Sequence, residues 1–235
     1  MRLGDFKALS FDCYGTLIDW EAGLSAAWAP LRAAAGGGDE ALFTLFGRLE
    51  SAQQASAPSM LYPEVLAAVY RDMAAALGVE VNDADSARFG GSVGEWPAFA
   101  DTAEALRYLS GHFRLFVLSN VDRASFAKTA ARLGVAFDGV FTAQDTGSYK
   151  PDTRNFEYLL ARIGELGIER GELLHVAQSL FHDHVPAGRL GIASAWIDRR
   201  AGKDGGATTK AEGEVGYLLR FETMGALAAA HREGR

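Results

Sequence analysis

Short apolar runs rich in β-branched and aromatic residues alternate along this chain with longer stretches that have helical spacing. The runs are the expected strands, Ala8 to Phe11, Leu115 to Leu118, Val140 to Thr142, Leu173 to Val176 and Ala193 to Ile197. The expected helices of the same part of the chain are Thr102 to Gly111, Arg123 to Leu133, Thr153 to Leu166 and Asp183 to Leu190. This alternation predicts a parallel sheet that is covered by helices on both faces. We therefore expect a doubly wound α/β core whose ligand site lies beyond the carboxyl ends of the strands.

The segment from Trp20 to Trp96 interrupts the alternation, because it contains helical patterns and no convincing strand. Its expected helices are Glu21 to Ala35, Asp39 to Gln53, Pro63 to Leu77 and Asp83 to Gly91. We interpret this segment as a helical cap inserted into the α/β core. The predicted core comprises residues 1–17 and 98–235, and the predicted cap comprises residues 18–97. The stretch 199–213, rich in Gly, Lys and Thr, is expected to be a mobile loop near the end of the core.

Charge and cysteine content exclude several classes of function. The 235 residues include 23 Lys and Arg against 30 Asp and Glu, a net charge of −7 that disfavours binding to nucleic acid and to anionic membranes. Cys13 is the only cysteine, so neither an intrachain disulfide nor a zinc-type cysteine cluster can form. No apolar stretch reaches the roughly 20 residues that span a bilayer, and the N-terminus lacks the apolar region of a signal peptide. We expect a cytoplasmic protein that acts on a small molecule.

Asp12 occupies the position where an α/β core would place a nucleophile. It follows the first expected strand and precedes a tight turn that contains Gly15. The run Phe11-Asp12-Cys13-Tyr14-Gly15-Thr16-Leu17 resembles the first motif of the haloacid dehalogenase superfamily. Three later stretches match its other motifs in order: Leu118-Ser119-Asn120, Tyr149-Lys150-Pro151-Asp152, and Val176-Ala177-Gln178-Ser179 leading to Asp183. The resemblance covers essentially the whole chain and implies a Rossmann-like core with a helical cap inserted after the first strand.

This resemblance implies a role for each matching residue. Asp12 would attack the substrate and form an ester, which water then hydrolyses at the aspartate carbonyl. Lys150 would keep Asp12 ionised, because a neighbouring ammonium lowers the pKa of a carboxyl group, and Asp183 would hold Lys150. Ser119 and Asn120 would bind the anionic part of the substrate. The remaining expected substrate-binding residues are Tyr14, Thr16, Trp20, Arg48, Glu50 and Gln178.

Two positions depart from the phosphatases of the superfamily. Tyr14 stands where those enzymes carry an aspartate that acts as a general acid, and Gln178 stands where they carry an aspartate that helps to hold Mg²⁺. The site therefore has one carboxylate fewer for a cation that prefers charged oxygen ligands. A halide ion leaves without a proton, so Tyr14 suffices for a 2-haloacid substrate. The chain thus resembles the type II L-2-haloacid dehalogenase branch. We expect no cofactor and no metal, with Mg²⁺ required only in the alternative of a phosphatase.

The cap leaves the identity of the leaving group open. Familiar L-2-haloacid dehalogenases have Ser and Asn where this chain has Gln178 and Leu180, and Arg48 is the candidate for their halide-binding arginine. The run Phe46 to Gln54 is similar to the L-azetidine-2-carboxylate hydrolases, whose ring nitrogen leaves as an amine that already carries its proton. In that alternative Glu50 pairs with the substrate ammonium. A non-catalytic protein that binds small acids is a further alternative, and the resemblance also permits a homodimer.

Overall fold

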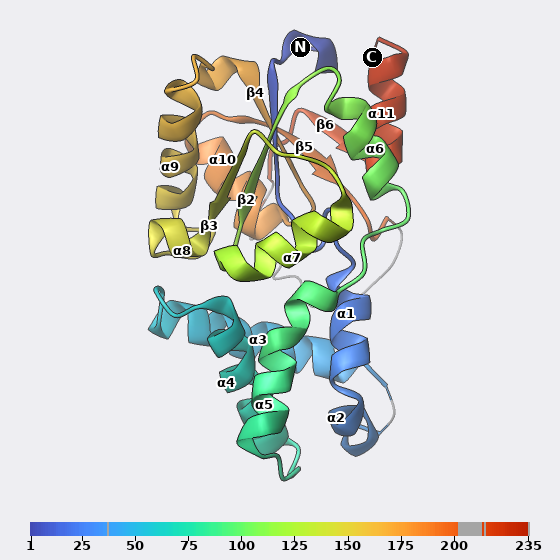
Figure 1. Ribbon diagram of the computed structural model, residues 1–235, viewed down its shortest axis with the longest axis vertical. Coiled ribbons are helices and arrows are strands. Elements are labelled where there is room, and N and C mark those ends of the chain that lie inside the picture. The colour runs from blue at the N-terminus through green and yellow to red at the C-terminus, as the bar shows by residue number, and fades with distance from the viewer. Residues whose placement is uncertain (37, 202–212, 214, 235) are drawn as a thin grey trace.

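The computed structural model describes residues 1–235 except 37, 202–212, 214 and 235 (Figure 1). Six strands form one sheet in the order β3-β2-β1-β4-β5-β6, and every neighbouring pair is parallel. Their bounds are β1 Ala8–Phe11, β2 Arg114–Ser119, β3 Gly139–Thr142, β4 Leu173–Ala177, β5 Ala193–Ile197 and β6 Leu219–Phe221. The predicted α/β class with a doubly wound parallel sheet is confirmed, and the sheet has one strand more than the sequence predicted.

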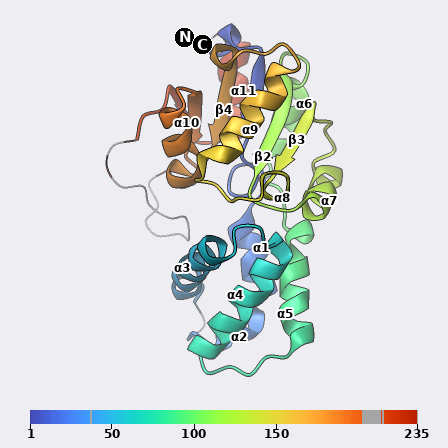
Figure 2. The ribbon, with the colours of Figure 1, turned by 90° about the vertical axis from the view of Figure 1, so that its left-hand side faces the viewer.

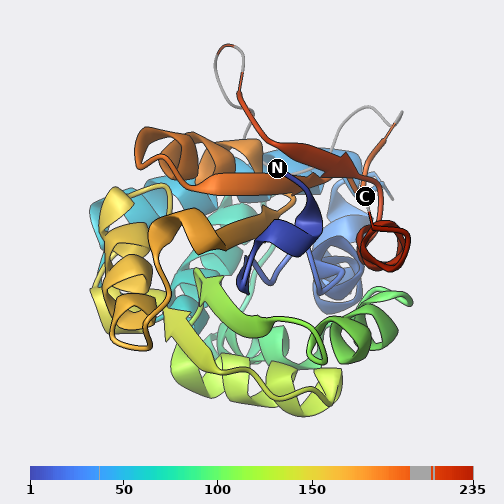
Figure 3. The ribbon, with the colours of Figure 1, turned by 90° about the horizontal axis from the view of Figure 1, so that it is seen from above.

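Helices cover both faces of the sheet (Figures 2 and 3). They are α6 Thr102–Leu109, α7 Arg123–Leu133, α8 Ala143–Thr146, α9 Thr153–Gly164, α10 Val185–Arg189 and α11 Met224–Arg232. Alternate residues of a strand face opposite sides, so each face has its own buried cluster. On β1, Leu9 and Phe11 share a cluster with Leu106 of α6, whereas Ala8 shares the other cluster with Phe156 of α9.

The segment after β4 differs from the predicted single helix Asp183 to Leu190. A π-helical turn, Leu180–His184, comes first and continues directly into α10. The turn begins early because Ser179 caps it, with its hydroxyl oxygen accepting a hydrogen bond from the backbone N–H of His182 at 3.1 Å. This arrangement brings His182 and Asp183 close to the end of β4. Most of the predicted mobile loop 199–213 lies outside the described residues.

Five helices from Trp20 onward form a separate group beyond the carboxyl ends of the strands, at the bottom of Figure 1. They are α1 Trp20–Ala27, α2 Ala29–Ala34, α3 Glu40–Ser56, α4 Tyr62–Ala76 and α5 Asp83–Gly90, followed by a 3-10 turn, Gly91–Glu95. The predicted helix Glu21 to Ala35 is two helices, because Pro30 cannot donate a backbone hydrogen bond to continue α1. Gly23 of α1 allows close packing, since a Cβ atom there would lie 2.2 Å from the Trp96 ring.

Two segments connect this helical cap to the core, and they run side by side. The backbone N–H of Asp19 donates to the carbonyl of Pro97 at 2.8 Å, and that of Phe99 donates to the carbonyl of Leu17 at 3.1 Å. The predicted boundaries after residues 17 and 97 fall within these segments. Within the described part of the chain, no helix has both the length and the apolar character that crossing a membrane requires.

Candidate active site

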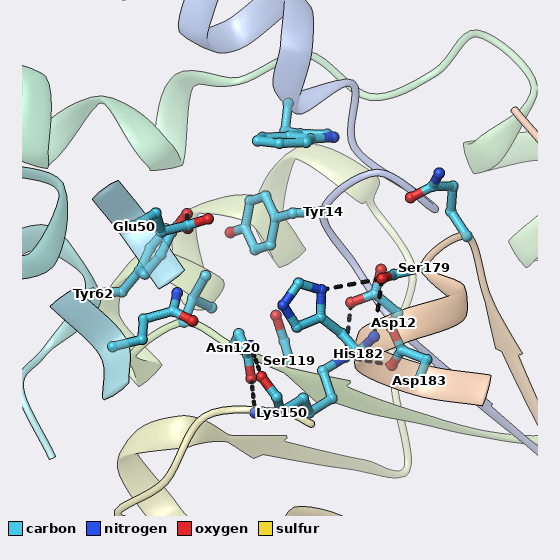
Figure 4. A pocket seen from close by; sticks show the side chains of 14 residues that line it. Asp12, Tyr14, Glu50, Tyr62, Ser119, Asn120, Lys150, Ser179, His182 and Asp183 are labelled. Carbon is cyan, nitrogen blue, oxygen red and sulfur yellow. Dashed lines mark hydrogen bonds and ion pairs between the residues drawn. The ribbon is translucent and has the colours of Figure 1, made fainter. Parts of the chain in front are cut away.

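A pocket lies between the carboxyl ends of β1, β2 and β4 and the cap (Figure 4). β1 lies between β2 and β4: the chain passes from β1 to β2 and β3 on one side and then crosses back to β4 on the other. Doubly wound sheets bind their ligands at such a point. The pocket has a cavity volume of about 80 Å³, which suits a small molecule. The core lines the pocket with Asp12, Tyr14, Ser119, Asn120, Val121, Lys150, Gln178, Ser179, His182 and Asp183, and the cap lines it with Trp20, Glu50, Gln54 and Tyr62. All predicted site residues are therefore present except Thr16 and Arg48.

Asp12 is held at the end of β1 by its backbone and by both carboxylate oxygens. Its N–H donates to the carbonyl of Val176 at 3.0 Å. Oδ1 accepts a hydrogen bond from Lys150 Nζ at 2.9 Å, and Oδ2 accepts one from Thr16 Oγ1 at 2.7 Å. The turn that follows requires Gly15, whose φ of +99° lies in the left-handed region that favours glycine. The carboxylate is thereby fixed in one orientation at the pocket.

Lys150 is buried, with 2% of its side chain exposed, and its ammonium is fully used. Nζ donates to Asp12 Oδ1, to the carbonyl of Leu118 at 2.9 Å and to Asp183 Oδ1 at 2.7 Å. The Asn120 amide holds the backbone of Lys150 on both sides, since Nδ2 donates to its carbonyl at 3.0 Å and Oδ1 accepts from its N–H at 2.6 Å. Asn120 lines the pocket, where it was predicted to lie. Its amide, however, is used to position Lys150.

Asp12 and Asp183 share the single ammonium of Lys150, and their pKa values move in opposite directions. Burial raises the pKa of Asp12 above its ordinary value and the charge of Asp183 adds to this, while Lys150 and Thr16 lower it. The sequence analysis expected Lys150 to lower the pKa of Asp12. Lys150 acts in that direction, but burial outweighs it. Burial also disfavours the charged form of Asp183, but Lys150 and His175 outweigh burial and hold its pKa well below the usual range. Lowering of this pKa favours the ionised form of Asp183, which lies 2.7 Å from Lys150 Nζ as its counter-ion.

His175 is a residue of this network that the sequence analysis missed. Its Nε2 lies 3.0 Å from Asp183 Oδ1, and its Nδ1 lies 2.8 Å from Ser10 Oγ. Both histidine contacts are buried, so the ring fixes the orientation of the Asp183 carboxylate. The other oxygen, Asp183 Oδ2, is buried and has no hydrogen-bond partner among the described residues. The only sequence signal was a polar residue inside the apolar run of β4.

Two predicted residues lie outside the pocket, and both corrections have a geometric reason. Thr16 is fully buried, and its Oγ1 accepts from the N–H of Gln178 at 2.9 Å while it donates to Asp12. It positions the Asp12 carboxylate and is not placed to contact a ligand in the pocket. Arg48 is exposed on α3, because residues two positions apart, such as Arg48 and Glu50, do not share a helix face. The predicted contact of Arg48 with the substrate does not fit this position.

The cap wall of the pocket is acidic instead of basic. Glu50 Oε1 accepts a hydrogen bond from Tyr62 Oη at 2.6 Å. Burial raises the pKa of Glu50 to about 7, although this hydrogen bond opposes the shift. Trp20 and Gln54 complete the cap lining, so no Lys, Arg or His of the described cap residues reaches the pocket. Tyr14 faces this wall from the core and shares a hydrogen bond of 2.7 Å with Thr129 Oγ1.

The described residues fit a divalent cation poorly. No group of three or more His, Cys, Asp or Glu side chains in the described ranges is arranged to hold a metal ion. Both Asp12 oxygens already accept hydrogen bonds from protein donors, and Gln178 contributes a neutral amide where a second carboxylate would be needed. Mg²⁺ prefers charged oxygen ligands in octahedral geometry, and these residues do not supply them.

Comparison with known proteins gives a consistent result. A family model described as haloacid dehalogenase-like hydrolase matches residues 6–177. A curated (S)-2-haloacid dehalogenase of Pseudomonas putida is 27% identical over 129 residues, and the match spans 54% of this chain and 55% of that relative, about half of each. The defluorinating L-2-haloacid dehalogenase Rha0230 has a TM-score of 0.79 at 19% identity, with 99% of both chains covered. The L-2-haloacid dehalogenase from Xanthobacter autotrophicus, solved with chloropropionic acid covalently bound, has a TM-score of 0.78 at 19% identity, covering 97% of this chain and 98% of that one. At these identities the structural likenesses show a shared fold.

Proposed function

The chain belongs to the haloacid dehalogenase-like hydrolases, and from this membership we propose that it displaces a leaving group at C2 of a small 2-substituted carboxylic acid. Halide is the first expected leaving group, as in the (S)-2-haloacid dehalogenase relative. The observation that carries the proposal is the pocket-lining Asp12 carboxylate, bound by Lys150, with Asp183 as the second acceptor of the same ammonium. No proton donor is needed for a halide that departs as an anion.

In the first step, one Asp12 oxygen forms a bond to C2 while the bond from C2 to the leaving group breaks and its electron pair departs with that group. Lys150 and Thr16 hold the carboxylate in the orientation that this in-line displacement needs. The product is an ester between Asp12 and the substrate. Because attack comes from the face opposite the leaving group, configuration at C2 is inverted.

In the second step, water attacks Cγ of Asp12 and the bond between Cγ and the ester oxygen breaks. Asp183 Oδ2 is a buried acceptor without a protein partner and is suited to orient this water. The departing 2-hydroxy acid takes one proton, and one proton passes to solvent, so Asp12 returns as a carboxylate. The rate enhancement comes from dividing one difficult displacement into two easier steps.

A substrate panel tests this proposal. We expect 2-halopropionate to react for one enantiomer only, to give the inverted 2-hydroxy acid, and to react equally well with and without EDTA. Racemic product would contradict the in-line geometry. Hydrolysis of phosphate esters that appears on adding Mg²⁺ and exceeds every 2-substituted acid would replace this function by that of a phosphatase. Binding of 2-substituted acids without turnover would instead indicate the non-catalytic small-acid binding protein.

Ring opening of azetidine-2-carboxylate is a second candidate function, and the acidic cap wall favours it. Glu50 offers a carboxylate to the pocket, whereas no cation of the described cap residues faces a departing halide. The ring nitrogen of the zwitterionic substrate is positively charged, so it stabilises the ionised form of Glu50. The amine leaves with its proton already attached, and the Asp12 ester forms as before.

The substitution Glu50→Gln separates the two leaving groups. Since burial raises the pKa of Glu50 to about 7, this side chain is neutral below that pH and negative above it. If the substrate is the zwitterion, wild-type kcat/KM for ring opening should rise as the pH increases through about 7. Glu50→Gln should then lower it by about tenfold or more at pH 8, the usual cost of losing a charged hydrogen-bond partner. For a 2-haloacid, the same variant should keep or increase kcat/KM.

The matched control is Glu80→Gln, which changes an exposed cap carboxylate in the same way. It should leave both reactions unchanged at every pH. If Glu50→Gln also left both unchanged, Glu50 would play no part in either reaction and the acidic wall would not define the substrate.

A further inference from the structure

His182 faces the pocket, and none of the steps above uses it (Figure 4). The residue lies in the π-helical turn that Ser179 caps. Its Nδ1 is 3.0 Å from Ser179 Oγ, so this ring nitrogen is turned away from the pocket while Nε2 faces it. Burial lowers the pKa of His182 to about 4, and the ring is therefore neutral near pH 7 with a proton on only one nitrogen.

The hydrogen bonds of Ser179 favour one of the two positions for that proton. Its oxygen already accepts the backbone N–H of His182 at 3.1 Å, and its own hydroxyl proton needs an acceptor because the side chain is buried. His182 Nδ1 is the acceptor that the structure places within hydrogen-bond distance in the described part of the chain. With Nδ1 accepting, the ring proton lies on Nε2, and the imidazole presents an N–H donor to the pocket.

A second unused donor faces the same part of the pocket. Ser119 is 1% exposed, and its Oγ has no hydrogen-bond partner among the described residues. Ser119 and His182 both line the pocket, and Figure 4 draws both side chains there. A buried hydroxyl without a partner costs free energy, so this geometry favours a ligand that accepts a hydrogen bond from it.

The substrate needs such donors, because Lys150 has none left. All three ammonium protons of Lys150 are directed at Asp12, Leu118 and Asp183. A substrate carboxylate that enters beside Asp12 therefore gains attraction from the Lys150 charge, but its hydrogen bonds must come from other groups. Donation to an ionised acceptor is stronger than donation to a neutral one.

We propose that His182 Nε2–H binds the carboxylate of the substrate beside Ser119 Oγ–H, the donor that the resemblance already assigns to the anionic group, which makes His182 a specificity-determining residue of this site. The ligand class rests on the proposed function, a 2-substituted carboxylic acid. Two donors on one side of the pocket fix the carboxylate and direct C2 toward Asp12. A neutral imidazole achieves this without a second cation that would compete with Lys150 for the nucleophile.

The test compares His182→Leu with His182→Gln, because the amide nitrogen of glutamine reaches nearly the position of Nε2 and still donates. We expect His182→Leu to weaken propionate binding about 10- to 100-fold, the usual cost of a lost hydrogen bond to a charged group, and to raise KM for 2-halopropionate more than it lowers kcat. His182→Gln should restore most of the affinity. His112→Leu, the same change at an exposed histidine, is the control and should have no effect. Thermal unfolding of each variant checks that it is folded.

Three results would overturn the proposal. Unchanged propionate affinity in folded His182→Leu would show that the ring does not bind the carboxylate. A ¹⁵N spectrum of the wild-type ring with the proton on Nδ1 would remove the donor. Equal loss of kcat in both variants, with the ester accumulating, would make His182 a base instead. If wild-type protein bound propionate and turned over a 2-haloacid while any of these held, this inference alone would fail. If it did neither, the proposed function would fail as well.

Discussion

Replacing Asp12 with asparagine should reduce kcat/KM by roughly 10³-fold or more, the scale seen when a covalent nucleophile is removed. The amide has nearly the same shape as the carboxylate, and its oxygen still accepts a hydrogen bond from Lys150, so the fold should remain intact. What is lost is the negatively charged oxygen that forms the bond to C2. Steady-state turnover of 2-halopropionate measures the effect.

The control for this loss is Asp72→Asn, the same change at an exposed position of α4. That variant should retain wild-type kcat/KM. If Asp12→Asn, shown by circular dichroism to be folded, kept its activity to within about tenfold, another group would have to be the nucleophile and the mechanism proposed above would be wrong.

Replacing Lys150 with methionine should lower the free energy of unfolding by about 3–5 kcal/mol near neutral pH, because it leaves buried carboxylates without their counter-ion. Asp12 and Asp183 both accept hydrogen bonds from this ammonium, and Lys150 is 2% exposed. Turnover should also be lost, since Asp12 would be protonated more readily and would no longer be oriented. Urea unfolding and kcat/KM measure the two effects.

The pH dependence of this loss has a definite sign. In the wild-type protein the pKa of Asp183 is lowered, so its contribution to stability is present above the ordinary aspartate pKa of 3.8 and disappears as the pH falls below it. In Lys150→Met the unpaired carboxylates can protonate, so the difference from wild type should shrink between pH 8 and pH 5. The exposed Lys128→Met variant is the control and should differ little from wild type at either pH. A loss that grew on acidification would contradict the shared ion pair.

The core was predictable because its signals are local. A buried parallel strand is a short apolar run, and all five predicted strands are present with ends that differ by at most one residue. β6 was missed because Leu219–Phe221 is only three residues long and has no distinct pattern. Asp12 was found because it directly follows the end of β1, at the edge of the sheet where a ligand site is expected. Lys150 lies beyond β3 and α8, so it was found through the motif resemblance and not through a strand end.

The cap side of the site was less predictable, because it depends on how helices turn toward the core. Sequence alone admitted both Arg48 and Glu50, and only the orientation of α3 separates them. Asn120 and Thr16 were expected at the substrate, but their polar groups are used by Lys150, Asp12 and Gln178, which no spacing in the sequence reveals. The capped π-helical turn that brings His182 to the pocket likewise depends on local geometry.

Single-turnover hydrolysis in ¹⁸O-labelled water tests the aspartyl ester most directly. Water that attacks Cγ of Asp12 leaves its oxygen in the enzyme, so the peptide containing Asp12 should gain ¹⁸O while the 2-hydroxy acid from the first turnover carries none. Mass spectrometry of the digested protein and of the product reads both results. An unlabelled Asp12 peptide together with ¹⁸O in the first-turnover product would show that water attacks the substrate directly, and would contradict the ester on Asp12.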